Sequence, residues 1–289
     1  MIFSKNKITF LSGAMGTEIQ RRGCLTTLPL WSAKVLFEKP ELVKEIHKDY
    51  IKAGADVITT NTFRTQRRTL RKVGLEKETE RINKLAVQLA TKAIEEAGAD
   101  RKIWIAACTT TLEDCYRPNL VPAEKELEKE HREQAELLAG FGIDFFLIET
   151  MNTIAEAEVA ACAARKTGKP FAISFVPDTS GDIFDGSSWK EAVEALAPLG
   201  PIAFLVNCAR PEIITESIKK IKECTNIPFG GYGNGDGGPA DKEGWEFKNK
   251  DDTELYVAEA AKWKKLGATI IGGCCGTNPE YTKRYVKIE

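Results

Sequence analysis

The chain has few histidines, no long apolar run and almost no net charge, and each absence excludes a class of protein. Only two histidines, His47 and His131, occur among 289 residues, and both fall in predicted polar helices. Paired-histidine metal sites, Ser-His-Asp triads and histidine proton relays are therefore disfavoured. No apolar run approaches the ~18 residues of a membrane-spanning helix, and Lys5 and Lys7 interrupt the N-terminal stretch that a signal peptide would need. The net charge of −1 lacks the basic excess of a nucleic-acid or polybasic membrane-binding protein. We expect a cytoplasmic protein with neither nucleic acid nor membrane as a partner.

Cysteine is what the chain does have. The eight cysteines are Cys24, Cys108, Cys115, Cys162, Cys208, Cys224, Cys274 and Cys275. In a chain of this length without a secretory signal we expect them to be reduced. Metal binding or thiol chemistry is the better use for some of them.

Short apolar or β-branched runs recur along the chain, and each is followed by a turn signal and then a helical pattern. The eight runs expected to form strands are 8–11, 57–60, 103–108, 145–148, 171–175, 203–206, 227–231 and 269–273. The amphipathic stretches between them are 40–53, 78–97, 123–140, 152–167, 188–199, 211–224 and 252–266. This alternation is typical of βα units around a parallel sheet. We predict an α/β fold, a (β/α)8 TIM barrel that spans residues 1–289 as a single domain.

Polar or reactive residues gather where these predicted strands end. They are residues 13–17 (GAMGT), 61–63 (NTF), 149–151 (ETM), 207–208 (NC) and 272–277 (GGCCGT). Two long segments, 109–122 and 232–251, also follow strands, and we interpret the second as a lid loop. A TIM barrel carries its active site at this rim, so we expect the functional site there.

The cysteines at two of these strand ends have the pattern of a metal site. Cys274 and Cys275 are adjacent, and flanking glycines let the chain bend so that both sulfurs face the barrel mouth. Cys208 comes from a strand two positions away around the ring. Three sulfurs suit Zn²⁺ and leave the fourth tetrahedral position open for a substrate. The spacing alone leaves an alternative, in which these are buried, unreactive cysteines.

The chain resembles the homocysteine S-methyltransferase family of zinc-dependent thiol methyltransferases, from about residue 10 to about residue 285. The most specific part pairs 270–277 (IIGGCCGT) with 206–208 (VNC), and 13–17 (GAMGT) and 53–62 (AGADVITTNT) support it. The resemblance implies that Cys208, Cys274 and Cys275 bind Zn²⁺ and activate the acceptor thiol. The other five cysteines are then structural.

The resemblance also implies a reaction between two small molecules. A methyl group passes from an activated donor, which is S-methylmethionine, S-adenosylmethionine or a betaine-like onium, to the thiol of homocysteine, and the product is methionine. Coordination to Zn²⁺ deprotonates the thiol, which is otherwise a poor nucleophile near neutral pH. No histidine base is required, which agrees with the histidine count.

The acceptor needs groups that hold its ammonium and its carboxylate. Glu149 matches the family's acidic residue for the ammonium, and the alternative for it is a surface carboxylate. The backbone of Gly13, Ala14 and Met15 resembles the family's carboxylate-binding loop, because consecutive amides at a helix start form an anion nest. The alternative there is a glycine turn required for tight packing. The predicted substrate site also includes Ser12, Asn61 and Thr62.

Ser12 is a departure from the family. Relatives usually carry an aspartate immediately before the glycine at position 13, where it helps to hold the substrate ammonium. A hydroxyl here replaces a full charge and leaves Glu149 as the charge partner. Either homocysteine binds more weakly, or the acceptor is a related thiol with a different polar end.

The methyl donor is expected to be a cation without N–H groups, which aromatic faces hold best. Trp31 matches an aromatic position of the family, and Phe63 and Tyr232 lie at other strand ends. Packing is the alternative role for each. Tyr116 and Arg117, in the long third loop, are candidates to contact a larger donor.

Two other functions stay open from the sequence. One is a methyl-accepting subunit that uses methylcobalamin carried on a separate corrinoid protein, and the other is a non-catalytic protein that binds zinc and thiols. The chain has no corrinoid-binding motif of its own around either histidine. The sequence predicts neither the donor nor the oligomeric state.

Overall fold

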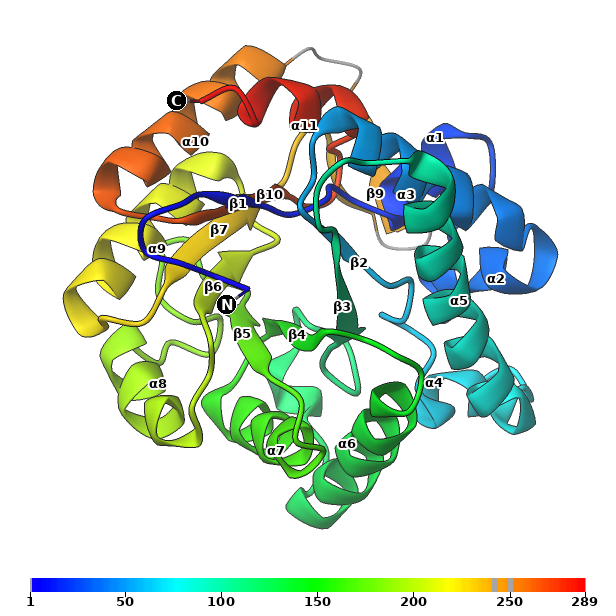
Figure 1. Ribbon diagram of the computed structural model, residues 1–289. Helices are drawn as coiled ribbons and strands as arrows, with labels where there is room; N and C mark the ends of the chain where they lie inside the picture. The colour runs from blue at the N-terminus through cyan, green and yellow to red at the C-terminus, as the bar shows by residue number, and fades with distance from the viewer. Residues whose placement is uncertain (1, 241–243, 249–251, 289) are drawn as a thin grey trace.

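The computed structural model describes residues 2–240, 244–248 and 252–288, and its centre is a parallel sheet of eight strands surrounded by helices (Figure 1). These strands are β1 (Thr9–Phe10), β2 (Val57–Thr59), β3 (Trp104–Thr109), β4 (Phe145–Met151), β5 (Phe171–Phe175), β6 (Phe204–Asn207), β7 (Phe229–Gly233) and β10 (Ile270–Gly273). Their order in the sheet is β1, β10, β7, β6, β5, β4, β3, β2. A parallel bridge between Leu11 and Val57 joins the two edges. The predicted (β/α)8 TIM barrel is therefore confirmed.

Helices connect the strands on the outside of the ring. The α-helices are α1 (Gly16–Arg21), α2 (Lys34–Glu38), α3 (Pro40–Ala53), α4 (Arg67–Arg71), α5 (Thr79–Ala97), α6 (Glu124–Ala139), α7 (Ile154–Lys166), α8 (Trp189–Leu196), α9 (Pro211–Cys224), α10 (Thr253–Leu266) and α11 (Pro279–Tyr285). Short 3-10 turns are η1 (Trp31–Ala33), η2 (Glu76–Glu78), η3 (Pro118–Leu120) and η4 (Ala197–Leu199). Among the described helices, none is long and apolar enough to cross a membrane.

Helix α3 shows how the sequence makes these elements. Pro40 occupies the first turn, where its missing N–H has no helical partner to lose. Val43, Ile46 and Tyr50 recur at helical spacing and are buried against the barrel. Gly54 then ends the helix with a left-handed φ of 112°.

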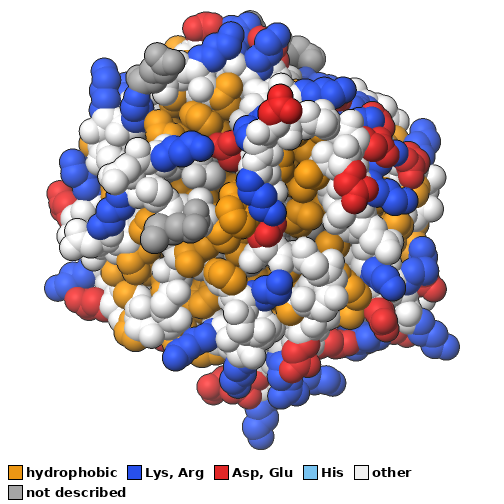
Figure 2. Space-filling model, in the orientation of Figure 1, with side chains coloured by type: hydrophobic (Ala, Val, Ile, Leu, Met, Phe, Trp, Pro, Cys, Tyr) orange, Lys and Arg blue, Asp and Glu red, His pale blue; other side chains and the backbone are white. Residues whose placement is uncertain are grey.

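The inside of the barrel is filled at its N-terminal end. The ring of Phe3 packs edge-on against Phe145, the first residue of β4, with 5.4 Å between ring centroids. Leu11, Val57 and Leu205 belong to the same buried cluster. A cavity lies toward the opposite, C-terminal ends of the strands. On the face shown in Figure 2, basic and acidic side chains are interspersed around the periphery.

The structure departs from the sequence prediction in the connections. Helices α1, α2, α4 and α11 were not predicted, because elements of five to seven residues carry too little periodic signal and depend on tertiary packing. The predicted lid loop 232–251 instead contains an antiparallel hairpin of β8 (Gly238–Ala240) and β9 (Gly244–Glu246). Residues 241–243 and 249–251 of that segment lie outside the described residues.

Candidate active site

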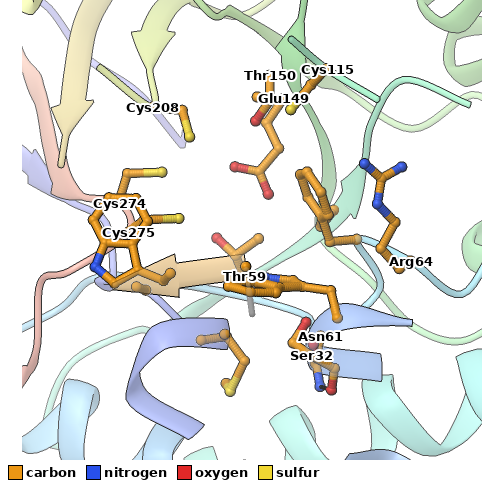
Figure 3. A pocket seen from close by; sticks show the side chains of 18 of the residues that line it. Ser32, Thr59, Asn61, Arg64, Cys115, Glu149, Thr150, Cys208, Cys274 and Cys275 are labelled. Carbon is orange, nitrogen blue, oxygen red and sulfur yellow. Dashed lines mark hydrogen bonds between the residues drawn. The ribbon is translucent and has the colours of Figure 1, made fainter. Parts of the chain in front are cut away.

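A cavity of about 650 Å³ opens at the C-terminal mouth of the barrel. Its walls come from the segments after β1, β2, β3, β6 and β10, from the strands β4 and β7, and from the hairpin β8–β9. Figure 3 shows that the side chains at these strand ends converge on one space. The cavity therefore lies where the sequence predicted the functional site.

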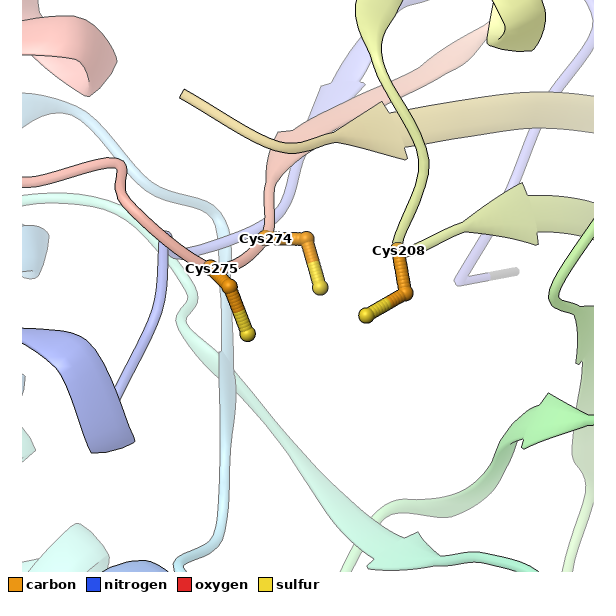
Figure 4. A group of neighbouring side chains, drawn as sticks. All are labelled: Cys208, Cys274 and Cys275. Carbon is orange, nitrogen blue, oxygen red and sulfur yellow. The ribbon is translucent and has the colours of Figure 1, made fainter. Parts of the chain in front are cut away.

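Three cysteine sulfurs meet at one side of this cavity. Cys208 follows β6, whereas Cys274 and Cys275 follow β10, and the strand β7 lies between these two in the sheet. The three Sγ atoms lie within 4.8 Å of one another (Figure 4). Sulfurs that share a tetrahedral Zn²⁺ at Zn–S distances of about 2.3 Å are separated by about 3.8 Å. The cluster therefore fits a zinc ion with small side-chain adjustments.

The thiols are also arranged so that one can lose its proton. The side chains of Cys208 and Cys275 form hydrogen bonds to Cys274 and lower the pKa of that thiol. The same contact with Cys274 raises the pKa of Cys208. These contacts favour loss of the proton from Cys274, and a divalent cation bound to the cluster would stabilise the resulting thiolate.

The fully buried side-chain amide of Asn207 connects the groups around the cysteine cluster. Its Oδ1 accepts hydrogen bonds from Ser174 Oγ at 2.7 Å and from the backbone N–H of Thr150 at 3.1 Å. Its Nδ2 donates to Thr150 Oγ1 at 2.8 Å and lies 3.9 Å from Cys274 Sγ. Asn207 thus ties the ends of β4, β5 and β6 to Cys274, which follows β10.

Glu149 reaches the cavity through an irregularity in β4. The pairing of β4 with β5 changes register between Ile148 and Met151, and Thr150 has a positive φ of 61°. A bulge of this kind redirects a side chain, and the Glu149 carboxylate points into the cavity (Figure 3). Tyr232 donates a hydrogen bond to its Oε2 at 3.0 Å.

The pKa of Glu149 is raised to about 7. Burial is the largest cause and the nearby Cys274 adds to it, whereas hydrogen bonds with Cys108 and Tyr232 partly offset the rise. None of the described basic side chains forms an ion pair with this carboxylate. An ammonium group bound beside it would stabilise its charged form. Glu149 is therefore suited to bind a cationic group of a substrate.

Backbone strain is concentrated around this cavity. Among the described residues other than glycine, the positive φ angles belong to Trp31, Thr150 and Cys208, and all three line the cavity. Such conformations cost of the order of 1–3 kcal/mol each and persist where surrounding contacts enforce them. Their location points to function at this site.

The sequence of the chain matches a known family over nearly its whole length. The family described as homocysteine S-methyltransferase matches residues 9–288. The chain belongs to this family. It is 34% identical over 291 residues to homocysteine S-methyltransferase YbgG of Bacillus subtilis, with 93% of the chain and 90% of that relative covered. It is 31% identical over 296 residues to homocysteine S-methyltransferase of Escherichia coli, with coverage of 96% and 94%.

Solved structures agree with this assignment. The metallated form of the homocysteine methyltransferase MmuM from Escherichia coli superposes with a TM-score of 0.84 at 28% identity, covering 96% of this chain and 95% of that one. Membership of the homocysteine S-methyltransferase family makes the protein a methyltransferase enzyme.

The turn expected to bind the acceptor carboxylate lines the cavity, as the family resemblance implies. Gly13 has no room for a side chain, since a Cβ there would lie 2.8 Å from Tyr50 and from Thr277. The N–H of Ala14, however, already donates to Thr277 Oγ1 at 3.3 Å. The glycine therefore serves tight packing, and one amide of the expected nest is occupied.

Of the other residues predicted to bind the acceptor, Ser12 and Asn61 line the cavity, whereas Thr62 does not. Ser12 is buried at the cavity wall and its Oγ accepts a hydrogen bond of 3.4 Å from the N–H of Thr59. Asn61 lines the cavity and donates to the carbonyl of Ser32 at 2.9 Å. Thr62 is not among the residues that line the cavity. Its hydroxyl points into the protein and bonds to the carbonyl of Cys108, so the structure does not bring it to the site.

The three aromatic candidates for the donor site also differ. The Trp31 ring forms a cavity wall that is packed against Gly16 and Gly244, where added Cβ atoms would lie 2.3 and 1.7 Å from ring atoms. The guanidinium of Arg64 lies 4.9 Å from the centroid of the Phe63 ring. Tyr232 uses its hydroxyl on Glu149. Trp31 is therefore the best placed of the three to contact a cationic donor.

Sequence reasoning missed Arg64 and did not find the contacts that Asn207 and Tyr116 make. Asn207 was visible as the neighbour of Cys208, but its bonding to three strands was not. Arg64 follows the 61–63 motif and lines the cavity. Tyr116 was a candidate to contact a larger donor, and its hydroxyl lies 3.0 Å from Cys208 Sγ. Its position depends on the long loop after β3, whose path has no periodic signal.

Proposed function

We propose that the protein transfers a methyl group from an activated donor to the thiol of homocysteine and forms methionine, with Zn²⁺ held by Cys208, Cys274 and Cys275. The observation that carries the proposal is the convergence of three sulfurs within 4.8 Å in the same cavity as the buried carboxylate of Glu149. Membership of the homocysteine S-methyltransferase family supports it. A bound zinc ion would lower the pKa of the acceptor thiol and hold its sulfur.

The residues of the chain orient the acceptor around that sulfur. Glu149 binds the α-ammonium, and the hydroxyl of Tyr232 holds its Oε2 in place. Asn207 bonds to Thr150 and approaches Cys274, and it thereby fixes the positions of both relative to this carboxylate. The barrel and the hairpin β8–β9 enclose the reacting groups, which strengthens the electrostatic contacts inside.

The proposal uses no histidine base. His47 and His131 are both buried in α3 and α6 rather than on polar helix faces, and neither lines the cavity. A thiol activated by a metal needs no general base at the moment of methyl transfer. The residue set therefore agrees with nucleophilic sulfur attacking an electrophilic methyl group.

The donor in this proposal is an onium compound, namely S-methylmethionine, S-adenosylmethionine or a betaine-like compound, with Trp31 as its aromatic wall. No comparison supports a corrinoid partner, and family membership favours an enzyme over a non-catalytic zinc protein. A cytoplasmic location stays a prediction from the sequence.

The test is a donor comparison with zinc-loaded protein. The protein is incubated with homocysteine and, separately, S-methylmethionine, S-adenosylmethionine, betaine or methylcobalamin, and methionine is quantified. We expect turnover with an onium donor and none with the Cys208→Ala control. Methionine from methylcobalamin alone would favour the corrinoid alternative, and no product from any donor would refute the proposal.

A further inference from the structure

Arg64 is a buried cation without an acidic partner. Among the described arginines and lysines it alone is buried, with 9% of its surface exposed, and it lines the cavity. No carboxylate in the described part of the chain forms an ion pair with it, although Arg67 and Arg68 nearby both do. Arginine is rarely buried without a counter-charge, because its desolvation is then uncompensated.

The contacts that Arg64 does make leave most of its guanidinium available. Nη1 donates to the carbonyl of Glu113 at 3.0 Å and to that of Thr111 at 3.5 Å. The guanidinium also lies over the ring of Phe63, which fixes its plane. A guanidinium carries five N–H donors, and the described hydrogen bonds use Nη1. Nε and Nη2 can still form a bidentate contact with an anion.

No other cationic side chain among the described residues of the cavity wall is both buried and free of an acidic partner. Lys72 lines the cavity too, but its ammonium is bound to Glu113 Oε2 at 2.6 Å. Arg117 is exposed at the rim. In Figure 3, Glu149 lies between the cysteines and Arg64. A substrate that extends past Glu149 from the cysteines would approach the side of the cavity that Arg64 lines.

We propose that Arg64 binds the carboxylate of an amino-acid substrate and so selects substrates that carry one. This inference rests on the proposed function, in which both homocysteine and S-methylmethionine carry an α-carboxylate. The chemistry is the same for either source: a planar carboxylate accepts two parallel N–H bonds from a guanidinium that is already oriented and desolvated. For the acceptor, this contact adds to the one expected from the backbone amides of residues 13–15.

The competing explanation is that Arg64 only braces the loop after β3. Arg68 provides the matched control, because it holds the same loop through Glu113 Oε1 at 2.6 Å and is not among the residues that line the cavity. Loss of a brace should affect all ligands alike, whereas loss of a carboxylate site affects only ligands that have a carboxylate.

The test measures binding by calorimetry to the zinc-loaded wild type and to Arg64→Met, Arg64→Lys and Arg68→Met. The acceptor pair is L-homocysteine and 3-aminopropane-1-thiol, and the donor pair is S-methyl-L-methionine and trimethylsulfonium. For the pair that contacts Arg64, we expect Arg64→Met to weaken binding of the ligand with a carboxylate on the order of 30-fold. Binding of its carboxylate-free analogue should weaken less than twofold. Arg64→Lys should be intermediate, and Arg68→Met should leave both pairs near wild type.

The pair that responds identifies the source of the carboxylate. Equal weakening of both members of each pair would show a loop brace and overturn the proposal, as would no change in either pair. Because binding is measured without turnover, absence of methionine formation would refute the proposed function separately. A wild-type protein that binds none of the four probes would overturn both.

Discussion

Cys208 reaches the cavity because its backbone adopts a left-handed conformation, with φ at 62°, directly after the last residue of β6. A residue in regular strand geometry would alternate in or out of the barrel with its neighbours. The turn instead brings its sulfur to the two sulfurs that follow β10. The position of this thiol is thus a property of local backbone geometry.

Replacing Cys208, Cys274 or Cys275 by alanine is expected to lower the metal content well below the approximately one zinc per chain of a three-thiolate site. Cys162, which is exposed and outside the cavity, is the matched control and its alanine variant should retain the metal. Elemental analysis of the purified proteins measures this. Equal zinc in all four variants would contradict the assignment.

Glu149→Gln removes the charge that we expect to bind the acceptor ammonium in a buried site. The variant should lose about 2–4 kcal/mol of homocysteine binding while its zinc content stays unchanged. Titration calorimetry together with elemental analysis gives both values. A thiol affinity within twofold of wild type would exclude this role for the carboxylate.

The raised pKa of Glu149, about 7, predicts the direction of the pH dependence. In the free protein, the carboxylate becomes protonated as the pH falls through 7, and a neutral acid attracts an ammonium less. Homocysteine affinity should therefore fall between pH 8 and pH 6 in the wild type. Glu149→Gln should be flatter over this range, so parallel curves for the two proteins would contradict the prediction.

At the scale of elements, the ends of four strands are held together by one side chain. Asn207 bonds to Ser174 on β5 and to Thr150 on β4, and approaches Cys274 after β10. Asn207, Ser174 and Thr150 are buried, so a lost bond among them leaves an unsatisfied partner in a place without water. The geometry of the site thus depends on contacts between strand ends.

Asn207→Ala should destabilise the protein by about 2–4 kcal/mol and weaken metal retention, because several buried partners lose their bonds at once. Ser174→Ala removes one bond of the same set and should cost only about 1 kcal/mol with little effect on the metal. Denaturant unfolding and elemental analysis distinguish the two. Similar losses in both variants would argue against a central role for the amide.

Helix α3 carries a buried histidine that makes stability depend on pH. Neither ring nitrogen of His47 has a hydrogen-bond partner among the described residues, and burial lowers its pKa to about 4. In the unfolded chain the pKa is near 6.5. Between these values the unfolded state binds the proton that the folded state excludes, so stability is lost as the pH falls from 6.5 to 4.

His47→Leu should remove this component. The wild type is expected to lose up to about 3 kcal/mol between pH 6.5 and pH 4 from this group, and the variant should have a correspondingly smaller pH slope. Denaturant unfolding of both proteins across this range measures it. Equal slopes would show that His47 does not titrate in this way.

At the scale of the whole molecule, the cysteine cluster joins chain segments that are distant in the sequence. Residues 208 and 274–275 come together only because β6, β7 and β10 are neighbours in the closed ring. The unfolded chain does not present these sulfurs together. A metal that binds only the folded state adds its binding free energy to the stability of the entire barrel.

Removing the metal with a chelator is therefore expected to lower the unfolding temperature. A ligand at a hundred times its Kd contributes about 2.7 kcal/mol, which corresponds to roughly 5–10 °C for a domain of this size. Differential scanning calorimetry with and without chelator measures the shift. The Cys208→Ala protein serves as the control and should not respond, and an equal shift in it would place the metal elsewhere.

The sequence predicted all eight strands of the barrel to within two residues at most ends, because apolar runs and glycine turns are local signals. Five of the seven predicted helices lie within one residue of their expected bounds at both ends, including α3 and α9 without change. The short helices α1 and α4 and the hairpin β8–β9 were missed, since each forms only against the completed barrel. Short elements gain their stability from packing rather than from propensity.

Residue types at the strand ends, together with the barrel prediction, were enough to predict the side of the barrel where the site lies. The family resemblance supplied the expectation that Cys208, Cys274 and Cys275 bind zinc and that Glu149 binds the ammonium. The tertiary structure decided which polar groups face the cavity. The Thr62 hydroxyl points into the protein, and the Ala14 amide donates to Thr277. Tyr232 donates to Glu149, and Arg64 is buried at the cavity wall without an acidic partner among the described residues. The physical reason is that strand order and period are local properties, whereas hydrogen-bond partners and counter-charges belong to residues brought together only by the closed ring.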